Sequence, residues 1–497
     1  MTSHGHPGPG SRARRVAYLS YSSGIYDART IRMARSAIEA GAEVTVYARW
    51  EPGLPLVEQH DGFRLVRAPW VWQLAIPGFE RLLGGRIRGV PPRGWERARM
   101  NALAPPPALL AGDNEASGGT VVDSGPEAAR SAGALAQPQR RRGRSLAPRR
   151  LARRFVLRPI RGAWQAARRP FQLLQKYPAR PIAWARSVQR VAEPADIWHG
   201  MWAGSLPALD RLRHRFGGRT VYDSRDVYLE SRDLATAPRI VRPVIRAFER
   251  RWARRADVVI SVNHAYAELV SRAFDIPLPP VVMNCPEAWT PPAPPPDRIR
   301  EALGLPRSVA IVLYQGQLIS DRGIEQAMDA ILEVPGAMLV LLGYGQWRRY
   351  QRRSEEPPYA GRVRLLPAVH PTELVPWTAS ADVVVMPIQP TSLNHRYTTP
   401  QKLFESIAAG VPVVASDLPG MAEVLRDIEV GALCDPTSPP SIAAAIRDVL
   451  GVDDETRAAR RERILAAAHA RYNWAVQVDV LHATYRDLLA DRTRGPA

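Results

Sequence analysis

The chain has 497 residues, of which 45% are hydrophobic, and a formal net charge of +20. This length exceeds what one hydrophobic core supports, so two or more domains are expected. No run of about 18 apolar residues occurs, so no transmembrane helix is predicted, and Met1–Arg15 lacks the apolar core of a signal peptide. The two cysteines, Cys285 and Cys434, show no metal or disulfide spacing, so the expected location is the reducing cytoplasm.

The chain begins with the pattern of a doubly wound α/β sheet. A short apolar strand is predicted at 16–20 and a helix at 29–40, with Gly24 in the loop between them. Gly41 ends that helix, and a second strand follows at 43–48. Further strands of the same series are predicted at 196–199, 220–223, 256–262 and 280–284.

A Pro-rich, extended stretch at 290–297 separates this series from a second one. Apolar runs predict strands of the second series at 309–314, 337–342, 363–366, 381–386 and 411–415. Helices are predicted between them, for example at 324–332 and 439–450, and an Ala-rich helical stretch follows at 457–489. The fold class is therefore α/β, with two doubly wound halves joined by a stiff linker.

The positive charge is concentrated in one segment. Between Glu127 and Glu193 there are 17 Lys or Arg and no acidic residue, which leaves the rest of the chain close to neutral. Within 140–180 the arginines alternate with apolar side chains, which favours an anionic membrane surface as the partner. A solvated insertion without a partner is the second interpretation. Nucleic acid is the least favoured partner, because no groove-reading motif accompanies the charge.

The most informative segment is 396–416. It is predicted to form a loop, a short helix that carries Lys402 and Glu405, a turn at Gly410 and a buried strand. Nucleotides bind at this edge of parallel sheets in α/β proteins. The chain has only two lysines, Lys176 and Lys402, so a lysine at this place indicates that a compact, mobile ammonium is needed there. A second motif, Tyr314–Gly323, ends a strand and opens a helix, whose first backbone amides attract anions.

These motifs resemble the nucleotide-sugar site of GT-B glycosyltransferases, in particular the retaining enzymes of glycosyltransferase family 4. The resemblance covers most of the chain outside an insertion. It implies two Rossmann-like domains that face each other across a cleft, with a last helix that crosses back to the first domain. The implied boundaries are an N-terminal domain of 1–70 and 182–292, a partly disordered insertion of 71–181, a C-terminal domain of 298–465 and a crossing helix of 466–497.

In the family a Gly-Arg-Leu…Lys-Gly pattern holds the phosphates of the donor. Arg322 stands where the lysine is usual, and Gln317 replaces the usual arginine. Arg322 as a simple exposed helix residue stays an alternative. The donor-binding residues implied by the resemblance are Gly24, Gly316, Gln317, Arg322, Gly343, His370, Lys402, Leu403, Glu405 and Gly420.

Glu405 matches the second carboxylate of the family's Glu–seven residues–Glu motif, and Tyr397 stands at the first. A carboxylate at the second position can accept both ribose hydroxyls. The alternative for Glu405 is a helix-surface pair with Lys402. His370 lies where the base would bind, and a structural role is the more favoured interpretation for its side chain.

On the acceptor side the implied candidates are Asp27, Arg29, Asp223 and Arg225. A local Asp27–Arg29 salt bridge is an equal alternative. His199 matches the first His of the family's Asp-x-x-His-x-His strand end, while Met201 replaces the second. A core histidine with its hydrogen bonds satisfied is an equal alternative for His199.

The resemblance implies transfer of a sugar from a nucleotide-diphosphate sugar to an acceptor hydroxyl, with retention and without a metal ion or other cofactor. The implied catalytic residues are Arg322, Lys402 and His199, because charge that develops on the departing diphosphate needs preorganised cations. The expected acceptor is a lipid-linked sugar or cell-envelope glycan, at the inner face of the cell membrane. The alternatives are a GT-B epimerase or phosphorylase and a non-catalytic sugar-binding module.

Overall fold

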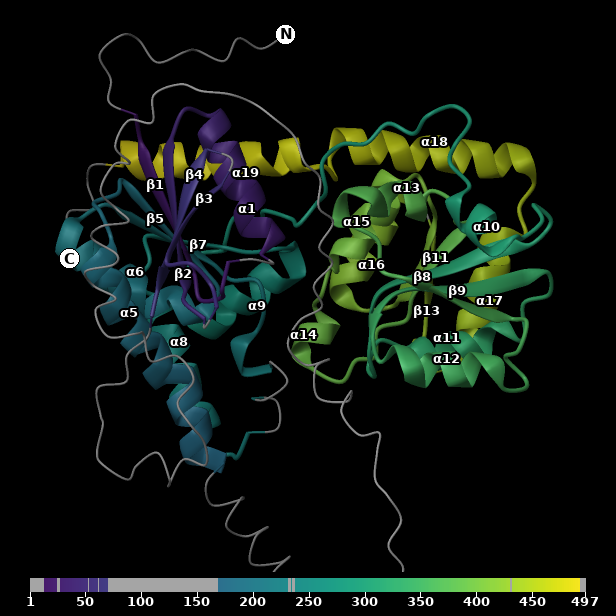
Figure 1. Ribbon diagram of the computed structural model, residues 1–497, viewed down its shortest axis with the longest axis horizontal. Coiled ribbons are helices and arrows are strands. Elements are labelled where there is room, and N and C mark those ends of the chain that lie inside the picture. The colour runs from purple at the N-terminus through teal and green to yellow at the C-terminus, as the bar shows by residue number, and fades with distance from the viewer. Residues whose placement is uncertain are drawn as a thin grey trace, which may run out of the picture. The chain divides into compact units, whose positions relative to one another are not determined.

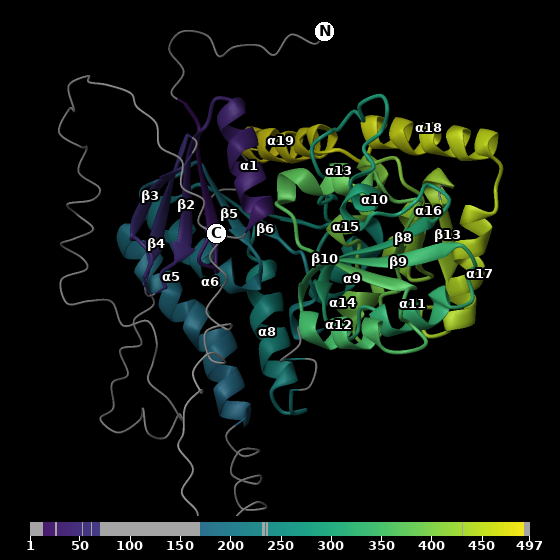
Figure 2. The same ribbon diagram turned by 45° about the vertical axis from the view of Figure 1, so that its right-hand side comes forward.

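The computed structural model describes residues 13–24, 27–51, 53–60, 62–69, 169–230, 234, 237–429 and 431–491. They form two parallel-stranded sheets with helices packed on both faces of each sheet (Figures 1 and 2). The prediction of an α/β fold with two doubly wound halves is confirmed. Most of the basic segment, residues 140–168, lies outside the described residues, as does the rest of the insertion back to residue 71.

The first sheet has the strand order β3-β4-β2-β1-β5-β6-β7. Its strands pair in parallel, except that β3 runs antiparallel to β4. The strands are β1 (Arg15–Ser20), β2 (Glu43–Arg49), β3 (Val57–His60), β4 (Phe63–Ala68), β5 (Ile197–Met201), β6 (Arg219–Asp223) and β7 (Val258–Ile260). The β3–β4 hairpin was not among the predicted strands. It turns at Gly62, whose φ of 83° suits glycine.

Helices of the first domain begin where side chains satisfy free backbone amides. Asp27 caps α1 by accepting from the Thr30 amide, and Asn263 caps α9 by accepting from the Tyr266 amide. The helices are α1 (Ala28–Glu39), α5 (Arg180–Val191), α6 (Leu206–Phe216), α8 (Arg242–Ala253) and α9 (His264–Phe274), and a π-helical turn η2 (Gln175–Ala179) leads into α5. Since the chain is already helical at residue 169, where the described part resumes, the expected boundary at 181/182 falls inside a helical stretch.

The second sheet has the strand order β10-β9-β8-β11-β12-β13, and its strands all pair in parallel. The reversal of strand order beside β8 is the arrangement that places loops of neighbouring strands apart and opens a binding crevice. The strands are β8 (Ala310–Leu318), β9 (Ala337–Gly345), β10 (Val363–Pro367), β11 (Val383–Met386), β12 (Val413–Ser416) and β13 (Gly431–Cys434).

The helices of the second half cover both faces of this sheet. Two separate apolar clusters fill the space between helices and sheet, one on each face, as expected for strands buried on both sides. The helices are α10 (Arg298–Leu303), α11 (Ile324–Ile331), α12 (Trp347–Glu355), α13 (Leu374–Thr378), α14 (Leu393–Arg396), α15 (Gln401–Ala408), α16 (Pro419–Ile428), α17 (Pro439–Leu450) and α18 (Asp454–Ala470). The last helix, α19 (Trp474–Ala490), packs on the first sheet.

The helical stretch predicted at 457–489 consists of two helices, α18 and α19. It breaks after Ala470, and Asn473 caps the next helix by accepting from the Val476 amide. Ile464 of α18 belongs to the core of the second domain, whereas Leu481 of α19 belongs to the core of the first. By these contacts α19 is part of the N-terminal domain, and the expected boundary at 465/466 lies within α18.

The prediction of a strand at 280–284 is wrong. The segment makes a single parallel bridge, Ser261 to Val281, and no ladder. Pro279 and Pro280 carry no amide hydrogen, so they cannot donate the bonds that a longer strand would need. Within the described part of the chain, no helix is both long and apolar enough to span a bilayer.

Candidate active site

The carboxyl edge of the second sheet is shaped by three glycines. Gly316 has a φ of 114°, and a Cβ on Gly343 would lie 1.8 Å from the Gly316 carbonyl oxygen. The two neighbouring strands β8 and β9 therefore approach each other too closely for a side chain at 343. A Cβ on Gly420 would lie 2.6 Å from the carbonyl oxygens of Tyr397 and Thr398, so the loop before α15 lies directly against α16.

The loop from β8 to α11 holds Arg322 in a constrained backbone. Its neighbours Asp321 and Gly323 have φ values of 70° and 72°, and a Cβ on Gly323 would lie 1.9 Å from the carbonyl oxygen of Pro387. The Gln389 amide donates to the Asp321 carbonyl oxygen at 3.1 Å, which fixes this loop to the segment after β11. Half-buried Arg322 is thus presented at the start of α11 by a loop with little freedom.

Lys402 lies half-buried in the first turn of α15. Its Nζ lies 4.0 Å from the centroid of the Tyr314 ring, close enough for a cation–π contact. Burial and the positive charge of Arg322 lower the pKa of Lys402 to about 7, and the Glu405 carboxylate only partly opposes this shift. Two cations predicted from separate motifs are therefore brought together, and they repel each other while no anion is bound.

Glu405 lies one turn further along α15 and is 7% exposed. One carboxylate oxygen accepts from Gln401 Nε2 at 2.9 Å and the other from Gln315 Nε2 at 3.0 Å. Thr378 Oγ1 donates to Gln315 Oε1 at 2.6 Å, so the amide of Gln315 is oriented toward the carboxylate. Burial raises the pKa of Glu405 to about 6 in spite of the two amide donors.

These amide side chains were missed in the sequence, and they connect the two domains. Asn284 Nδ2 donates to Gln401 Oε1 at 3.3 Å, and Arg32 Nη2 of the first domain donates to Asn284 Oδ1 at 2.8 Å. Nearby, Asn263 Nδ2 donates to the Tyr397 carbonyl oxygen at 2.8 Å. Amide side chains have no distinctive spacing, so no sequence pattern could have indicated this connection.

The other predicted donor-site residues occupy varied positions. Leu403 is fully buried in the core of the second domain, so only its backbone could contact a ligand. Gln317 is exposed, and its carbonyl oxygen accepts from the Tyr314 hydroxyl at 2.9 Å. His370 is also exposed, with Nδ1 2.8 Å from Thr372 Oγ1. Gly24 has a φ of 84°, and a Cβ there would lie 3.0 Å from Leu65.

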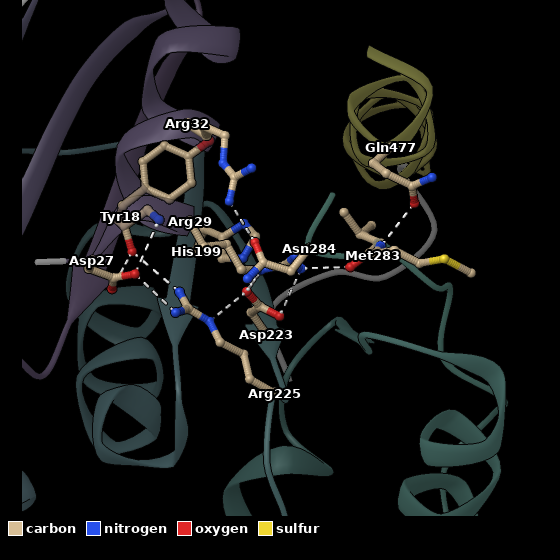
Figure 3. A network of polar contacts seen from close by, with 12 residues as sticks. Tyr18, Asp27, Arg29, Arg32, His199, Asp223, Arg225, Met283, Asn284 and Gln477 are labelled. Carbon is tan, nitrogen blue, oxygen red and sulfur yellow. Dashed lines mark hydrogen bonds and ion pairs between the residues drawn. The ribbon is translucent and has the colours of Figure 1, made fainter. Parts of the chain in front are cut away.

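The four acceptor-side candidates form one chain of charges in the first domain (Figure 3). Arg29 Nε donates to Asp223 at 2.8 Å, and Arg225 bridges Asp223 at 3.1 Å and Asp27 at 3.0 Å. A local Asp27–Arg29 pair is therefore not what the structure shows. Burial alone would raise the pKa of Asp27, but Arg225 and the hydrogen bonds from Thr30 bring it down to about 2.

His199, predicted as a catalytic residue, lies in the interior of the first domain. It lies within β5, two residues before the strand ends, and is fully buried. Its Nδ1 lies 2.6 Å from the Tyr485 hydroxyl of α19, and its ring packs against Tyr18. Burial lowers the pKa of His199 to about 3, so the ring is neutral. Its other ring nitrogen, Nε2, is buried without a hydrogen-bond partner, and in this structure the side chain is not accessible to a substrate.

A cavity of about 240 Å³ lies where the two domains meet. Arg29 and Arg225 line it from the first domain, and the loop 397–401 that leads into α15 lines it from the second. One nitrogen of Arg29, Nη1, is buried without a hydrogen-bond partner. The cavity therefore offers guanidinium groups to a polar ligand next to the start of the helix that carries Lys402 and Glu405.

Comparisons with known proteins agree with this architecture. Residues 310–451 match the family model of glycosyl transferases group 1. Over the full length the fold resembles sucrose-phosphate synthase from Thermosynechococcus elongatus, with a TM-score of 0.63, 17% identity and coverage of 96% of this chain and 99% of that one. It also resembles WaaG, a glycosyltransferase involved in lipopolysaccharide biosynthesis, with a TM-score of 0.54, 15% identity and coverage of 96% and 100%.

The chain has the GT-B fold, and its second half matches the glycosyl transferases group 1 family. Among curated relatives, the D-inositol 3-phosphate glycosyltransferase of Corynebacterium glutamicum is 30% identical over 207 residues, which are 39% of this chain and 47% of that protein. The phosphatidyl-myo-inositol mannosyltransferase of Mycobacterium tuberculosis is 34% identical over 191 residues, which are 37% and 48%. The chain thus spans about half the length of the curated relatives it matches.

Proposed function

We propose that this GT-B protein transfers a sugar from a nucleotide-diphosphate sugar to an acceptor hydroxyl, with retention of the anomeric configuration. The observation that carries the proposal is the meeting of Lys402, Arg322 and Glu405 at the carboxyl edge of the second sheet. They come from two motifs about 80 residues apart in the sequence, and the fold brings them to one place, as a nucleotide site requires.

The two cations suit a diphosphate leaving group. In the proposed step the bond from the anomeric carbon to the phosphate oxygen breaks, the acceptor oxygen bonds to that carbon on the same face, and the acceptor proton passes to the departing phosphate. Negative charge grows on the diphosphate as this bond breaks. Lys402 and Arg322 repel each other in the free protein, so an anion between them relieves that repulsion as well as being stabilised itself.

Glu405 is proposed to bind the ribose of the nucleotide. Its two oxygens now accept one hydrogen bond each, from Gln315 and Gln401, and each oxygen keeps a second lone pair that can accept from a ribose hydroxyl. Gln401 lies at the first position of α15 and borders the cavity between the domains, where its side chain can turn away. The ribose would then replace the Gln401 amide as the donor.

The acceptor is proposed to enter from the cavity lined by Arg29 and Arg225. The curated relatives are named for an inositol phosphate and for phosphatidyl-myo-inositol. A lipid-linked sugar or a cell-envelope glycan is the acceptor class we propose, and the partly unpaired guanidinium of Arg29 suits its polar groups. His199 has no contact role in this scheme and holds β5 against α19.

No metal ion is needed in this scheme, because arginine and lysine supply the positive charge. Within the described ranges, no three His, Cys, Asp or Glu side chains gather in a way that could hold a metal ion. Independence from metal stays a prediction. Transfer measured with an excess of a chelator such as EDTA should equal transfer without it, and a complete loss restored by Mg²⁺ would overturn this part of the proposal.

Peripheral attachment to the inner face of the cell membrane, in an otherwise cytoplasmic protein, is the last part of the proposal. Apolar side chains are exposed near the described end of the basic segment, at Phe171 (46%), and before and within α8, at Ile240 (73%) and Val244 (47%). Helix α8 contacts η2 of that segment. The full chain should float with vesicles of anionic lipid at low salt, and I240D/V244D should float less. No flotation of the unchanged chain would contradict membrane binding.

The experiment that tests the function is a donor screen. The full chain is mixed with UDP-, GDP- and dTDP-sugars, and binding is measured by calorimetry. Release of the nucleoside diphosphate and the anomeric configuration of the product are then followed by NMR with a lipid-linked acceptor. Binding with transfer and retention supports the proposal. Rearrangement of the sugar without transfer would favour the epimerase alternative, and binding of no nucleotide sugar would favour a non-catalytic module.

A further inference from the structure

A second cavity lies at the opposite, amino edge of the second sheet. It has a volume of about 360 Å³ and is lined by residues that precede β11 and β12, such as Asp382 and Pro412. Since the strands of this sheet run in parallel, this edge is remote from the carboxyl edge that carries Lys402. We call this cavity the arginine groove, because five arginines line it: Arg300, Arg307, Arg457, Arg460 and Arg461.

Two of the five arginines are neutralised. Arg300 contacts Asp297 at 2.9 Å and Asp382 at 2.5 Å, and these are the two carboxylates in the wall of the groove. Arg457 contacts Asp454 of its own helix at 2.7 Å. The acidic side chains of the wall are therefore already used by Arg300.

The other three arginines retain their charge without an acidic partner. Among the described residues, Arg307, Arg460 and Arg461 make no ion pair, and Arg307 is exposed. Arg460 Nη1 donates to the Val449 carbonyl oxygen at 2.9 Å. Arg461 Nη2 is buried and has no hydrogen-bond partner. Burial lowers the pKa of both Arg460 and Arg461, and the neighbouring arginines Arg463 and Arg457 lower that of Arg460 further.

A buried guanidinium nitrogen without an acceptor is unfavourable, and an anion in the groove would satisfy it. We infer that the arginine groove binds the phosphate or diphosphate group of a ligand other than the sugar donor. The planar fork of arginine matches phosphate oxygens better than a point charge does. The volume lies within the range of about 300–1,000 Å³ that is usual for sites of small molecules.

A ligand in the groove would contact both segments of the chain that connect the two domains. Pro294–Asp297 belongs to the linker from the first sheet to the second, and the arginines of α18 precede the helix that returns to the first domain. A ligand held there would tie linker and helix to the amino edge of the second sheet. The groove is thus placed as an effector site rather than as part of the donor site.

The test uses the full chain carrying Lys402→Ala, so that binding to the donor site is weakened beforehand. Inorganic pyrophosphate is titrated by calorimetry. On this background R307E and R461Q should each weaken pyrophosphate binding at least tenfold, whereas R364E, which reverses an exposed arginine on β10 outside the groove, should leave it unchanged. Equal affinity in R307E, R461Q and the parent would overturn the inference.

Two further measurements identify which kind of molecule supplies the phosphate group and distinguish a failure of this inference from a failure of the proposed donor site. Fructose 1,6-bisphosphate and vesicles with anionic phospholipid are compared as sources of the phosphate group. If R307E no longer binds fructose 1,6-bisphosphate, the ligand is a soluble molecule. If R307E no longer floats with the vesicles, the ligand is a lipid headgroup. If R307E changes neither the binding of fructose 1,6-bisphosphate nor the flotation, the inference is contradicted. With Lys402 intact, R307E and R461Q should bind a nucleotide sugar as the unchanged chain does. Thermal unfolding shows whether R461Q is folded, and if it is not, the test rests on R307E alone.

Discussion

Lys402 Nζ lies 4.0 Å from the centroid of the Tyr314 ring, with Arg322 near enough to disfavour its charge. The ring stabilises the ammonium while the neighbouring arginine and burial destabilise it. The result is a lysine whose pKa is lowered to about 7, so that near neutral pH the free protein holds it in both forms. A bound diphosphate would favour the charged form, and proton uptake is thereby coupled to donor binding.

The first prediction concerns donor binding above pH 7. Because the charged form of Lys402 is favoured in the complex, its pKa is higher there than in the free protein, where it is about 7. The affinity for a nucleotide sugar should therefore fall as pH rises above 7, by up to about tenfold per pH unit. Lys402→Arg should lose this dependence, since arginine stays charged. Parallel pH profiles of Kd for both proteins would show that another group is responsible.

The second prediction concerns the acid side of the same profile. Ribose binding needs the ionised carboxylate of Glu405, whose pKa is raised to about 6 by burial. Donor affinity should thus decline below pH 6. Glu405→Gln should be weaker by about 1.5–3 kcal/mol at pH 7, the usual range for a charge-assisted hydrogen bond, and should show no decline below pH 6. Calorimetric titrations between pH 5 and 8 would check both points, and an unchanged acid limb in the variant would refute the role of Glu405.

The third prediction concerns the loop that presents Arg322. Gly323 and Gly336 have nearly the same φ, 72° and 73°, but only at Gly323 would a Cβ meet a neighbour, the Pro387 carbonyl oxygen at 1.9 Å. Gly336→Ala should therefore lose only about 1–2 kcal/mol of stability, for the left-handed backbone. Gly323→Ala should lose more and should also weaken donor binding, because the loop must shift. Denaturant unfolding and donor titration of both variants decide this, and equal effects of the two substitutions would contradict it.

The fourth prediction concerns a carboxyl group buried under the acceptor side. Glu249 accepts from the Tyr222 hydroxyl at 2.9 Å, and burial raises its pKa to about 8. Between pH 5 and 8 the folded chain holds this proton while the unfolded chain has lost it. The free energy of unfolding should then fall as pH rises, by up to about 1.4 kcal/mol per unit from this group. In Glu249→Gln this contribution disappears. Urea unfolding at several pH values should then show a free energy of unfolding that falls less steeply with pH than in the unchanged chain.

Much of the fold could be predicted because buried parallel strands are continuous apolar runs in the sequence. The helix with Lys402 and Glu405 could be predicted as well, since both residues and Gly410 lie within one short segment. The position of His199 could not. Its strand continues to Met201, and its partner Tyr485 comes from a helix 286 residues further along the chain. Local sequence contains no information on which element will cover a strand, so a core histidine and an exposed one look alike.

The amide connection through Asn284 and Gln401 shows a second limit. Arg32, Asn284, Gln401 and Glu405 follow one another through hydrogen bonds across the two domains, yet they are far apart in the chain. Their residue types are common on any surface. Only the meeting of the segment after α9, which carries Asn284, with the first turn of α15 gives them a shared role, and this meeting is a property of the tertiary structure.

The most direct measurement is the calorimetric Kd of a nucleotide-diphosphate sugar for the unchanged chain, Lys402→Ala and Lys176→Ala. The two lysines are the only ones in the chain, and each lies near a tyrosine ring, Lys176 at 5.2 Å from that of Tyr177. Lys402→Ala should weaken binding by about 10- to 150-fold, corresponding to about 1.5–3 kcal/mol, and Lys176→Ala should not. Tight donor binding by Lys402→Ala, equal to that of the unchanged chain, would contradict the proposed diphosphate site.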